Sequence, residues 1–450
     1  MKKWKKISDL IFQYDYKNER FIIQTLPFKI FKLPKEYTEE QIKKAVKQIK
    51  PDYNPQIPPT KYYLPLFIGT TNCNFSCKYC YADAGSYGEK PLYMDKKVIE
   101  NSVKYITKKM RDICNTGIKK EIEIGAVFFG GESLLHFEGL KLLVQKMKEA
   151  VITLNKECQT LFKPLIIINT NGSMFTDEII DYITKNKEIL EVIISFDGLH
   201  HDKYRITKEK KPTSKIVIDG IKKIKEAGVT FSITCSEPPD EIEDIYNNIR
   251  YITELFGKET EINLSFIRGP IQAVKTKAAY PGILEAQYTT KSLEIFGEQV
   301  AKLIHEGYNL FIKRFENRVK EGGYIWRCPA SLFEFSVYVD GSVYPCHNFI
   351  DDKFKLGHIS DEKFDPTKKE EVIKKFKERT FDRIGCSECI FQTICLSSFD
   401  CPSHSYYDLG DFNSVDKRTC VAAKKIMEAL LEKVYLDKEI NGNEMGEVNK

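Results

Sequence analysis

The stretch TTNCNFSCKYCYADAG, residues 70–85, holds three cysteines within eight residues: Cys73, Cys77 and Cys80. It directly follows an apolar, β-branched run, YYLPLFIGT, at residues 62–70. Three and then two residues separate the cysteines, a spacing that is unusual for a disulfide framework and short for a zinc site. Thiols gathered on a loop after a buried strand therefore indicate a metal-binding or catalytic site.

Apolar runs of the same kind recur downstream and alternate with amphipathic helical patterns. The predicted strands are at 62–70, 125–131, 164–172, 191–198, 229–237 and 261–269, and the clearest helices at 94–110, 134–151 and 216–228. Buried strands alternating with helices predict an α/β fold with a parallel sheet of repeated βα units. The polar segments TTNC, GGE, TNG, SFDG, CSE and RG all fall at carboxyl ends of strands, where such folds build their active sites.

The overall composition excludes several classes of protein. The 450 residues include 69 Lys and Arg against 64 Asp and Glu, interspersed and without a basic stripe, so we expect no nucleic-acid binding. No run of about 18 apolar residues exists, so we expect no membrane span. The basic start lacks a long apolar segment, which predicts a cytoplasmic protein. Thirteen cysteines in that compartment favour metal binding or catalysis over disulfides.

A second group of cysteines follows residue 320, where the alternation of strands and helices ends. Its members are Cys328, Cys346, Cys386, Cys389, Cys395, Cys401 and Cys420. Either iron–sulfur clusters or a pair of zinc ribbons fits such a set, because Cys-x2-Cys pairs also bind zinc.

The remaining cysteines and two histidines have simpler interpretations. Cys114 and Cys158 are expected to be small packed hydrophobes, and Cys235 to be packed at the end of a strand. His200 and His201 are expected to lie in a polar loop.

Three thiolates suit a four-iron cluster, because each thiolate holds one iron and one iron stays open for a substrate or cofactor. On the loop that begins at residue 70, Tyr79 and Tyr81 would shield such a cluster from water.

The CxxxCxxC pattern with an aromatic residue before its third cysteine resembles the radical S-adenosylmethionine (SAM) superfamily. FFGGES, residues 128–133, resembles that family's GGE motif, although Ser133 stands where the family usually has proline. The resemblance implies that Gly130, Gly131 and Glu132 contact the amino group of SAM. It covers residues 62 to about 270 and implies a partial (β/α)6 TIM barrel.

NTNG (169–172) and SFDG (195–198) match the ends of the family's third and fourth strands. Strand parity would place Asn169 with Asn171, and Ser195 with Asp197, on one face. There Asn171, Ser195 and Asp197 would bind SAM, with hydroxyl and carboxylate groups suited to its ribose. Arg205 matches a basic residue near the SAM carboxylate, and the alternative is an exposed, solvated arginine.

The second cysteine group resembles a SPASM domain, the C-terminal extension of radical SAM enzymes that modify peptides. The chain has five residues before Cys401 where the family usually has three. The resemblance implies three [4Fe-4S] clusters, one binding SAM and two auxiliary. The inner auxiliary cluster would be held by Cys328, Cys346 and Cys401, with an open iron unless His347 or a carboxylate fills it. The ligands of the outer cluster would be Cys386, Cys389, Cys395 and Cys420.

These assignments predict five segments along the chain. They are an N-terminal strand and helix domain (1–60), a radical SAM partial barrel (61–270), a bridging helical region (271–322), a SPASM domain (323–430) and a polar tail (431–450). The first could recognise a leader peptide by pairing it with a sheet edge.

The resemblance implies reductive cleavage of SAM to a 5'-deoxyadenosyl radical, which removes hydrogen from a residue of a Cys-rich, ribosomally made precursor peptide. The expected product is a thioether crosslink of the sactipeptide or ranthipeptide kind, and the expected partners are that peptide with its leader and a reductant such as flavodoxin or ferredoxin. Two alternatives stay open: oxidation of Cys or Ser to formylglycine, as in anaerobic sulfatase maturases, and a non-catalytic iron–sulfur electron-transfer protein.

Overall fold

The computed structural model describes residues 3–49, 61–62, 65–88, 90–114, 121–267, 288–320, 322–323, 328, 330, 334–361, 370–380, 382, 384–396, 399 and 401–440. The chain forms two compact units. Unit 1 comprises residues 1–58, 288–328 and 377–450, and unit 2 comprises residues 59–287 and 329–376.

Six parallel strands follow one another in both sequence and space in unit 2. They are β6 (Leu66–Thr70), β7 (Glu121–Gly130), β8 (Leu161–Thr170), β9 (Leu190–Ser195), β10 (Phe231–Glu237) and β11 (Glu261–Phe266). The branched and aromatic residues that fill them fit a pleated, buried surface. The predicted α/β fold with repeated βα units is confirmed.

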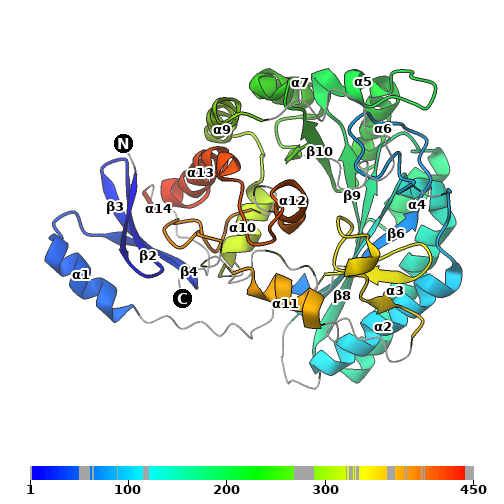
Figure 1. Ribbon diagram of the computed structural model, residues 1–450, viewed down its shortest axis with the longest axis horizontal. Coiled ribbons are helices and arrows are strands. Elements are labelled where there is room, and N and C mark those ends of the chain that lie inside the picture. The colour runs from blue at the N-terminus through cyan, green and yellow to red at the C-terminus, as the bar shows by residue number, and fades with distance from the viewer. Residues whose placement is uncertain are drawn as a thin grey trace. The chain divides into compact units, whose positions relative to one another are not determined.

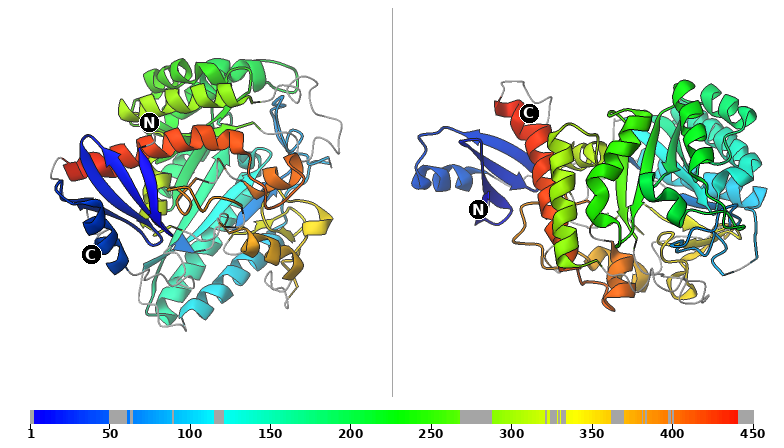
Figure 2. Two further views of the ribbon diagram at one scale, coloured as in Figure 1. Left: turned by 60° about the vertical axis from the view of Figure 1, so that its left-hand side comes forward. Right: turned by 90° about the horizontal axis from the view of Figure 1, so that it is seen from above.

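Helices connect these strands and lie along one side of the sheet (Figures 1 and 2). They are α2 (Lys96–Cys114), α3 (Phe137–Glu157), α4 (Asp177–Lys185), the short α5 (His201–Tyr204), α6 (Ser214–Glu226) and α7 (Ile245–Phe256). In α7, Ile245, Ile249, Ile252 and Phe256 recur at helical spacing and are at most 1% exposed. Helix α7 thus buries an apolar stripe.

Burial alternates along β8 and β9 of the sheet. Ile166 and Ile168 of β8 and Ile194 of β9 are 0% exposed, whereas Ile167 and Ile193 are only partly buried. Side chains of a strand point alternately to its two faces, so one face is fully covered and the opposite, inward face stays partly accessible. This accessible face is where a ligand can reach the carboxyl ends of the strands.

The sheet continues beyond β6 with strands from the C-terminal half of the chain. β12 (Ser336–Val337) pairs parallel with β6, and β13 (Ser342–Tyr344) and β14 (Gly357–His358) follow in antiparallel pairing. β5 (Lys61–Tyr62) pairs with β7 off this path, and α11 (Glu370–Glu378) lies where the chain passes from unit 2 to unit 1. The sheet is therefore mixed.

Unit 1 contains a separate antiparallel sheet and a set of helices. The strands are β1 (Trp4–Ser8), β2 (Ile11–Tyr16), β3 (Glu19–Thr25) and β4 (Phe28–Leu33), and the helices are α1 (Glu39–Gln48), α9 (Thr290–His305), α10 (Ile312–Lys320), α12 (Pro402–Asp408), α13 (Lys417–Leu431) and α14 (Asp437–Ile440). Thr38 begins α1 with a capping box to Gln41. Ile42 and Val46 of α1 then pack in one apolar cluster with Ile22 of the sheet.

A buried carboxylate joins this sheet to the C-terminal helices. Glu432 follows α13, whose ribbon crosses the strands in the left view of Figure 2. It accepts hydrogen bonds from Lys3 Nζ and Tyr14 Oη, both at 2.6 Å, and lies 3.4 Å from His305 Nε2. Burial opposes ionisation, but contacts with His305, Lys3 and Tyr14 outweigh it and hold the pKa of Glu432 below its usual value.

The predicted N-terminal strand and helix domain contains four strands in its described part, and one expectation for the other end of the chain needs correction. Trp4 of the basic N-terminal stretch lies in the first of these strands and is 5% exposed. Residues 431–450 were expected as a polar tail, but Val434 and Leu436 are buried and helix continues to Ile440. The last ten residues lie outside the described residues.

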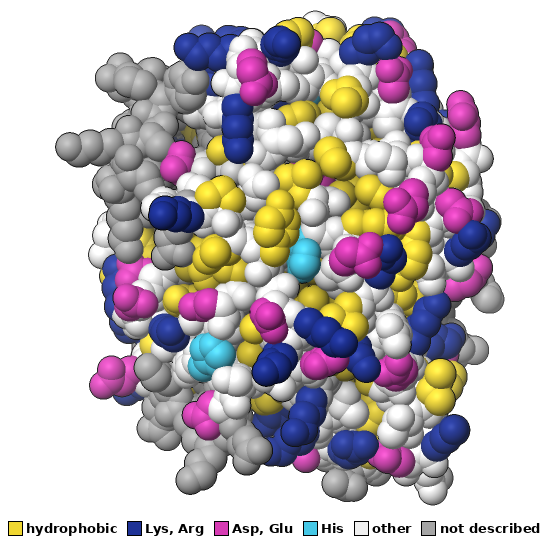
Figure 3. All heavy atoms as spheres, turned by 90° about the vertical axis from the view of Figure 1, so that its right-hand side faces the viewer, with side chains coloured by type: hydrophobic (Ala, Val, Ile, Leu, Met, Phe, Trp, Pro, Cys, Tyr) yellow, Lys and Arg dark blue, Asp and Glu magenta, His cyan; other side chains and the backbone are white. Residues whose placement is uncertain are grey.

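Figure 3 shows basic and acidic side chains interspersed over one face of the molecule, with small groups of apolar side chains between them. Such mixing agrees with the interspersed Lys and Glu of the sequence. In the described part of the chain, no helix has both the length and the hydropathy needed to cross a bilayer.

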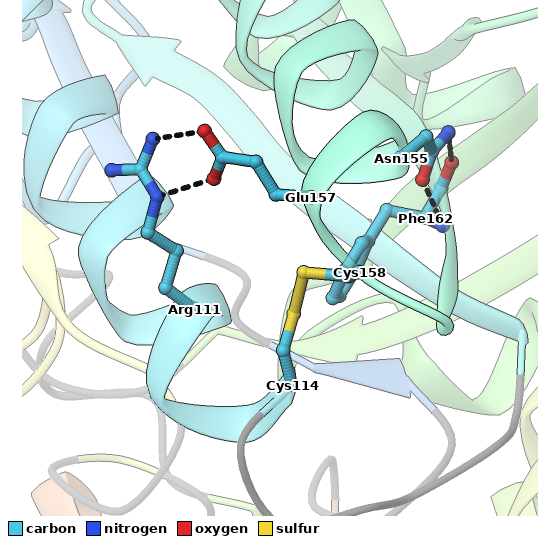
Figure 4. Close-up of a disulfide and its surroundings, with 6 residues drawn as sticks. All are labelled: Arg111, Cys114, Asn155, Glu157, Cys158 and Phe162. Carbon is cyan, nitrogen blue, oxygen red and sulfur yellow. Dashed lines mark hydrogen bonds and ion pairs between the residues drawn. A yellow bond between two sulfur atoms is a disulfide. The ribbon is translucent and has the colours of Figure 1, made fainter.

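Cys114 and Cys158 form a disulfide, so their assignment as packed hydrophobes is wrong (Figure 4). Cys114 ends α2 and Cys158 follows α3, and the neighbouring helix ends bring their Cα atoms to 5.7 Å. Arg111 and Glu157 form a two-bonded ion pair beside it. Neither helical pattern alone shows that the two ends meet.

Replacing both Cys114 and Cys158 with serine is expected to lower the free energy of unfolding by about 4 kcal/mol, because the bond closes a long loop in the unfolded chain. Its sequence separation is 44 residues. Denaturant titration of the variant beside the oxidised wild type measures this. Arg111→Gln is the control, since an ion pair this exposed to solvent contributes little to stability. Equal stability of the double variant and the wild type would show that the bond contributes nothing.

Candidate active site

The loop after β6 is bound to the end of β7. The N–H of Gly131 donates to Thr70 O at 2.9 Å, and the N–H of Glu132 donates to Asn72 O at 2.8 Å. The N–H of Asn72 in turn donates to Thr70 Oγ1 at 3.0 Å. The GGE segment therefore continues the pairing of the two strands and fixes where the cysteine loop begins.

Gly130 and Gly131 permit this close approach. A Cβ atom on Gly130, whose φ is +145°, would lie 2.3 Å from Thr70 O. One on Gly131 would lie 2.2 Å from Asn72 O, and one on Gly85 would lie 2.3 Å from the Cα of Gly131. Backbone packs directly on backbone here, which larger residues would prevent.

The other side of the loop pairs with the segment after α5. The N–H of Ser76 donates to Ile206 O at 2.7 Å, and the N–H of Lys78 donates to Tyr204 O at 2.9 Å. These two bonds flank Cys77 on one strand and Arg205 on the other. Cys77 and Arg205 are thereby held opposite each other.

The three cysteines of the loop lie close enough together that a charge on one thiolate acts on the others. Backbone N–H groups surround their sulfur atoms: Ala82, Ala84 and Gly85 donate to Cys80, and Phe75 donates to Cys73. Hydrogen bonds of this kind stabilise thiolate and tune iron–sulfur clusters.

An unusual backbone conformation produces the donors at Cys80. Asp83, Ala84 and Gly85 have φ values of 49°, 54° and 85°. Successive N–H groups in such a turn form a nest that binds an anion. Left-handed conformations at non-glycine residues cost free energy and cluster at functional sites. The loop thus presents preformed N–H donors to the Cys80 sulfur, although burial is the larger effect and raises the pKa of this thiol.

This donor set fits a four-iron cluster. Burial is the main cause that raises the pKa of the Cys77 thiol, to about 12, so a cation is needed there to hold the thiolate. Among the described residues, no three His, Cys, Asp or Glu side chains converge on the position of a single metal ion. A cubane spreads its ligands more widely, because each thiolate binds a different iron.

Glu132 is fully buried, and its own chain engages both carboxylate oxygens. Oε1 accepts from Thr170 Oγ1 at 2.7 Å and from the N–H of Leu134 at 3.0 Å, and Oε2 accepts from the N–H of Asn171 at 2.6 Å. In this structure the carboxylate joins the ends of β7 and β8. Contact of its side chain with SAM remains a prediction.

Asn171 also holds the cysteine loop. Its Nδ2 donates to Asn74 Oδ1 at 2.9 Å and lies 3.9 Å from Cys73 Sγ. The parity argument for Asn169 and Asn171 is wrong, because β8 ends at Thr170 and the alternation ends with it. Asn169 is partly exposed on the inward face, and Asn171 is buried.

The same correction applies to β9, which ends at Ser195. Ser195 is partly exposed on the inward face, whereas Asp197 is 1% exposed. Arg205 is 7% exposed and binds Asp197 with two hydrogen bonds, of 2.8 and 3.2 Å. The alternative of an exposed, solvated Arg205 is therefore excluded.

His201 was expected in a polar loop but is buried, and Tyr87 joins an aromatic cluster beside the cysteine loop. His201 is 0% exposed, and its Nδ1 accepts from the N–H of Asp197 at 3.2 Å. Tyr87 packs edge-on against Tyr81, and Tyr81 lies 5.9 Å from the ring of His347. The aromatic residues in the loop sequence are the signal from which this group of packed rings could have been predicted.

Cys235 is packed, as the sequence suggested. It is 0% exposed, and its thiol donates to Glu237 Oε1 at 2.9 Å.

The outer set of auxiliary cysteines comes together within unit 1. Three of them, Cys386, Cys389 and Cys395, lie on a segment of tight turns. The N–H of Cys389 donates to Cys386 O at 2.9 Å. Cys420 lies in α13, and the charges of Cys395, Cys386 and Cys389 all act on it. Four thiols from two separate segments thus lie close enough for their charges to interact, as the ligands of one cluster would.

The inner set is divided between the units. Cys346 belongs to unit 2, where its charge acts on Tyr81 and Tyr87, as does that of Cys80. Cys328 and Cys401 belong to unit 1. The grouping of these three cysteines remains a prediction.

Residues 67–252 match the model of the radical SAM superfamily. The chain contains a radical SAM domain. Residues 328–390 match an iron–sulfur cluster-binding domain, SPASM. The resemblance drawn from the cysteine spacings is confirmed.

Several curated proteins are similar to this radical SAM chain. A cysteine-type anaerobic sulfatase-maturating enzyme of Clostridium novyi is 24% identical over 341 residues, covering 73% of this chain and 85% of the relative. A serine-type anaerobic sulfatase-maturating enzyme of Bacteroides thetaiotaomicron is 23% identical over 375 residues, covering 75% and 82%.

Solved structures share the radical SAM fold. Native anSMEcpe with bound AdoMet and Kp18Cys peptide superposes with a TM-score of 0.62 at 20% identity, covering 86% of this chain and 99% of that one. Streptococcus suis SuiB bound to S-adenosylmethionine gives 0.50 at 13% identity, covering 92% and 100%.

Proposed function

We propose that this radical SAM enzyme oxidises a cysteine-containing peptide and closes a thioether between a Cys sulfur and a carbon of an acceptor residue. The observation that carries the proposal is the pairing of two thiol sites. One buried and two partly buried thiols in an N–H-lined loop lie at the accessible edge of the sheet, and four thiols lie within range of charge interaction in unit 1.

The residues of the loop would hold a [4Fe-4S] cluster through Cys73, Cys77 and Cys80. When bound, this cluster and SAM together supply a carbon-centred radical that removes hydrogen from an unactivated C–H bond. The chain's contribution is position and exclusion of water. Gly131 and Glu132 fix one end of the loop, and the pairing of Ser76 with Ile206 fixes the other.

The proposal includes two auxiliary clusters, with Cys386, Cys389, Cys395 and Cys420 holding the outer one. A thioether made from a thiol and a C–H bond removes two hydrogens from the substrate. One leaves as a hydrogen atom, and the other as a proton and an electron, which needs an acceptor. A cluster held by the second cysteine site of the same chain would accept that electron.

The partners in this proposal are a precursor peptide with a leader and a reductant such as flavodoxin or ferredoxin. The N-terminal sheet supports the first, because its order β1-β2-β3-β4 leaves two edge strands. An extended peptide can pair with such an edge.

Oxidation of Cys or Ser to formylglycine is the second candidate. The similarity to both cysteine-type and serine-type sulfatase-maturating enzymes favours it. It also begins with hydrogen removal from a side chain of a peptide and also needs an electron acceptor.

Mass spectrometry after anaerobic reaction with SAM distinguishes these functions. The substrates are a Cys-rich peptide encoded beside the gene and a synthetic sulfatase peptide with a central cysteine. A thioether loses two hydrogens, keeps its sulfur and resists thiol alkylation. Formylglycine made from cysteine exchanges sulfur for oxygen and reacts with a hydrazide, which would replace the thioether proposal with the second candidate. Cleavage of SAM with both peptides unchanged would contradict both functions.

A further inference from the structure

A buried charge network lies directly beside the cysteine loop. Asp197 at the end of β9 and Arg205 after α5 form an ion pair whose side chains are 0% and 9% exposed. Desolvated charges interact more strongly than surface charges, because water does not screen them. Such a pair can therefore act on its neighbours.

Both carboxylate oxygens of Asp197 accept hydrogen bonds from other groups of the chain. Oδ2 accepts from Tyr79 Oη and from Arg205 Nε, the latter at 2.8 Å. Oδ1 accepts from Arg205 Nη2 at 3.2 Å and from the N–H of Ser236 at 2.9 Å. Burial would raise the pKa of Asp197, but the Arg205 charge outweighs it and holds the pKa below its usual value.

The backbone of Arg205 is held equally firmly. Its N–H donates to His201 O at 2.7 Å, and its carbonyl accepts from Thr213 Oγ1 at 2.6 Å. His201 Nε2 lies 3.1 Å from Thr213 Oγ1. The guanidinium also lies over the ring of Tyr79, with 5.3 Å between Cζ and the ring centroid.

This network orients the Arg205 side chain toward Cys77 and Cys80, two of the expected cluster ligands. The two backbone bonds that flank Cys77 set Arg205 opposite it, and the Arg205 side chain hydrogen-bonds to Cys77. Its charge also acts on Cys80. A cation beside a cluster favours the reduced form, which carries one more negative charge.

We infer that Asp197 and Tyr79 position the Arg205 guanidinium against Cys77 so that its charge raises the reduction potential of the cluster bound by this loop. Asp197 then has a role distinct from binding the ribose of SAM. The inference rests on the radical SAM domain and not on the identity of the peptide.

The two members of the ion pair should shift the potential in opposite directions. Arg205→Gln removes the cation and should lower the midpoint potential. Asp197→Asn removes the anion that offsets the cation, keeps an oxygen for Arg205, and should raise it. We expect at least a tenfold change in the ratio of reduced to oxidised cluster at fixed potential, which is about 59 mV for one electron. Arg205→Lys keeps the charge and should fall between Arg205→Gln and the wild type.

The test is a redox titration of the reconstituted enzyme, followed by electron paramagnetic resonance in the absence of SAM. A variant with alanine at all three loop cysteines supplies the auxiliary signals for subtraction. Lys203→Gln is the matched control, because Lys203 lies two residues from Arg205 but is 49% exposed and paired with Asp240. Its midpoint should equal that of the wild type.

A lowered midpoint in Arg205→Gln together with a raised midpoint in Asp197→Asn supports the inference, and the reverse pair of shifts overturns it. Unchanged midpoints in both, or shifts of the same sign, overturn it, because the first shows no electrostatic influence and the second shows a general disturbance of the site. If Arg205→Gln fails to retain iron, a raised midpoint in Asp197→Asn still supports the inference, and an unchanged or lowered one overturns it. Failure to modify any peptide leaves these potentials measurable, so the proposed function is tested separately.

Discussion

Replacing Cys77 with alanine is expected to reduce SAM cleavage to the level found without enzyme and to remove about four irons per chain. Each thiolate of the loop would hold one iron. The variant keeps only two of the three thiolates, and two are too few to retain the cluster. Cys77 lies between the two backbone bonds that fix the loop, and neither bond involves its sulfur. Iron analysis and chromatography of 5'-deoxyadenosine measure both effects.

Cys235→Ala is the matched control for Cys77→Ala. Cys235 is a buried cysteine of the same unit, and its thiol contacts Glu237 and not the loop. This variant should keep the iron and the SAM cleavage of the wild type. Retention of wild-type SAM cleavage by Cys77→Ala would refute the assignment of the loop.

Replacing Cys420 with alanine is expected to separate SAM cleavage from product formation. The side chain lies where three other thiols meet, so its loss should remove about four irons per chain. The loop of unit 2 is untouched, so 5'-deoxyadenosine should still form. The electron left by the oxidised substrate then lacks its acceptor, and the modified peptide should be absent.

The same iron analysis and peptide mass spectrometry measure the effect of Cys420→Ala. The Cys235→Ala variant again serves as the control for loss of a buried cysteine. An unchanged iron content in Cys420→Ala would rule out a cluster at this site. Normal product with reduced iron would show that the outer cluster is not needed for the reaction.

Periodicity was sufficient to predict the core of unit 2. Branched apolar runs such as 191–198 alternate with helical patterns such as 216–228, and only a parallel sheet with covering helices buries both. Cysteine spacing was sufficient to predict the loop, because the local chain itself delivers those ligands.

Features that depend on contacts distant in sequence could not be predicted in this way. The Cys114–Cys158 disulfide requires two helix ends to meet. The indole N–H of Trp4 in β1 donates a hydrogen bond to Glu428, and 424 residues separate the two. No local pattern in the sequence contains either contact.

The burial of Arg205 is a third case. In sequence it looks like an exposed arginine after a turn, but Asp197 forms an ion pair with it and the cysteine loop pairs with its backbone segment. Parity failed at Asn171 and Asp197 because both strands end one or two residues earlier. Alternation applies only while the backbone remains extended.

The most direct test of the account is anaerobic incubation of the reconstituted wild-type protein with SAM and dithionite, with Cys77→Ala beside it. We predict 5'-deoxyadenosine from the wild type alone. If the wild type forms none while iron and sulfide analysis shows intact clusters, the catalytic account is wrong, and Cys73, Cys77 and Cys80 are ligands of an electron-transfer protein.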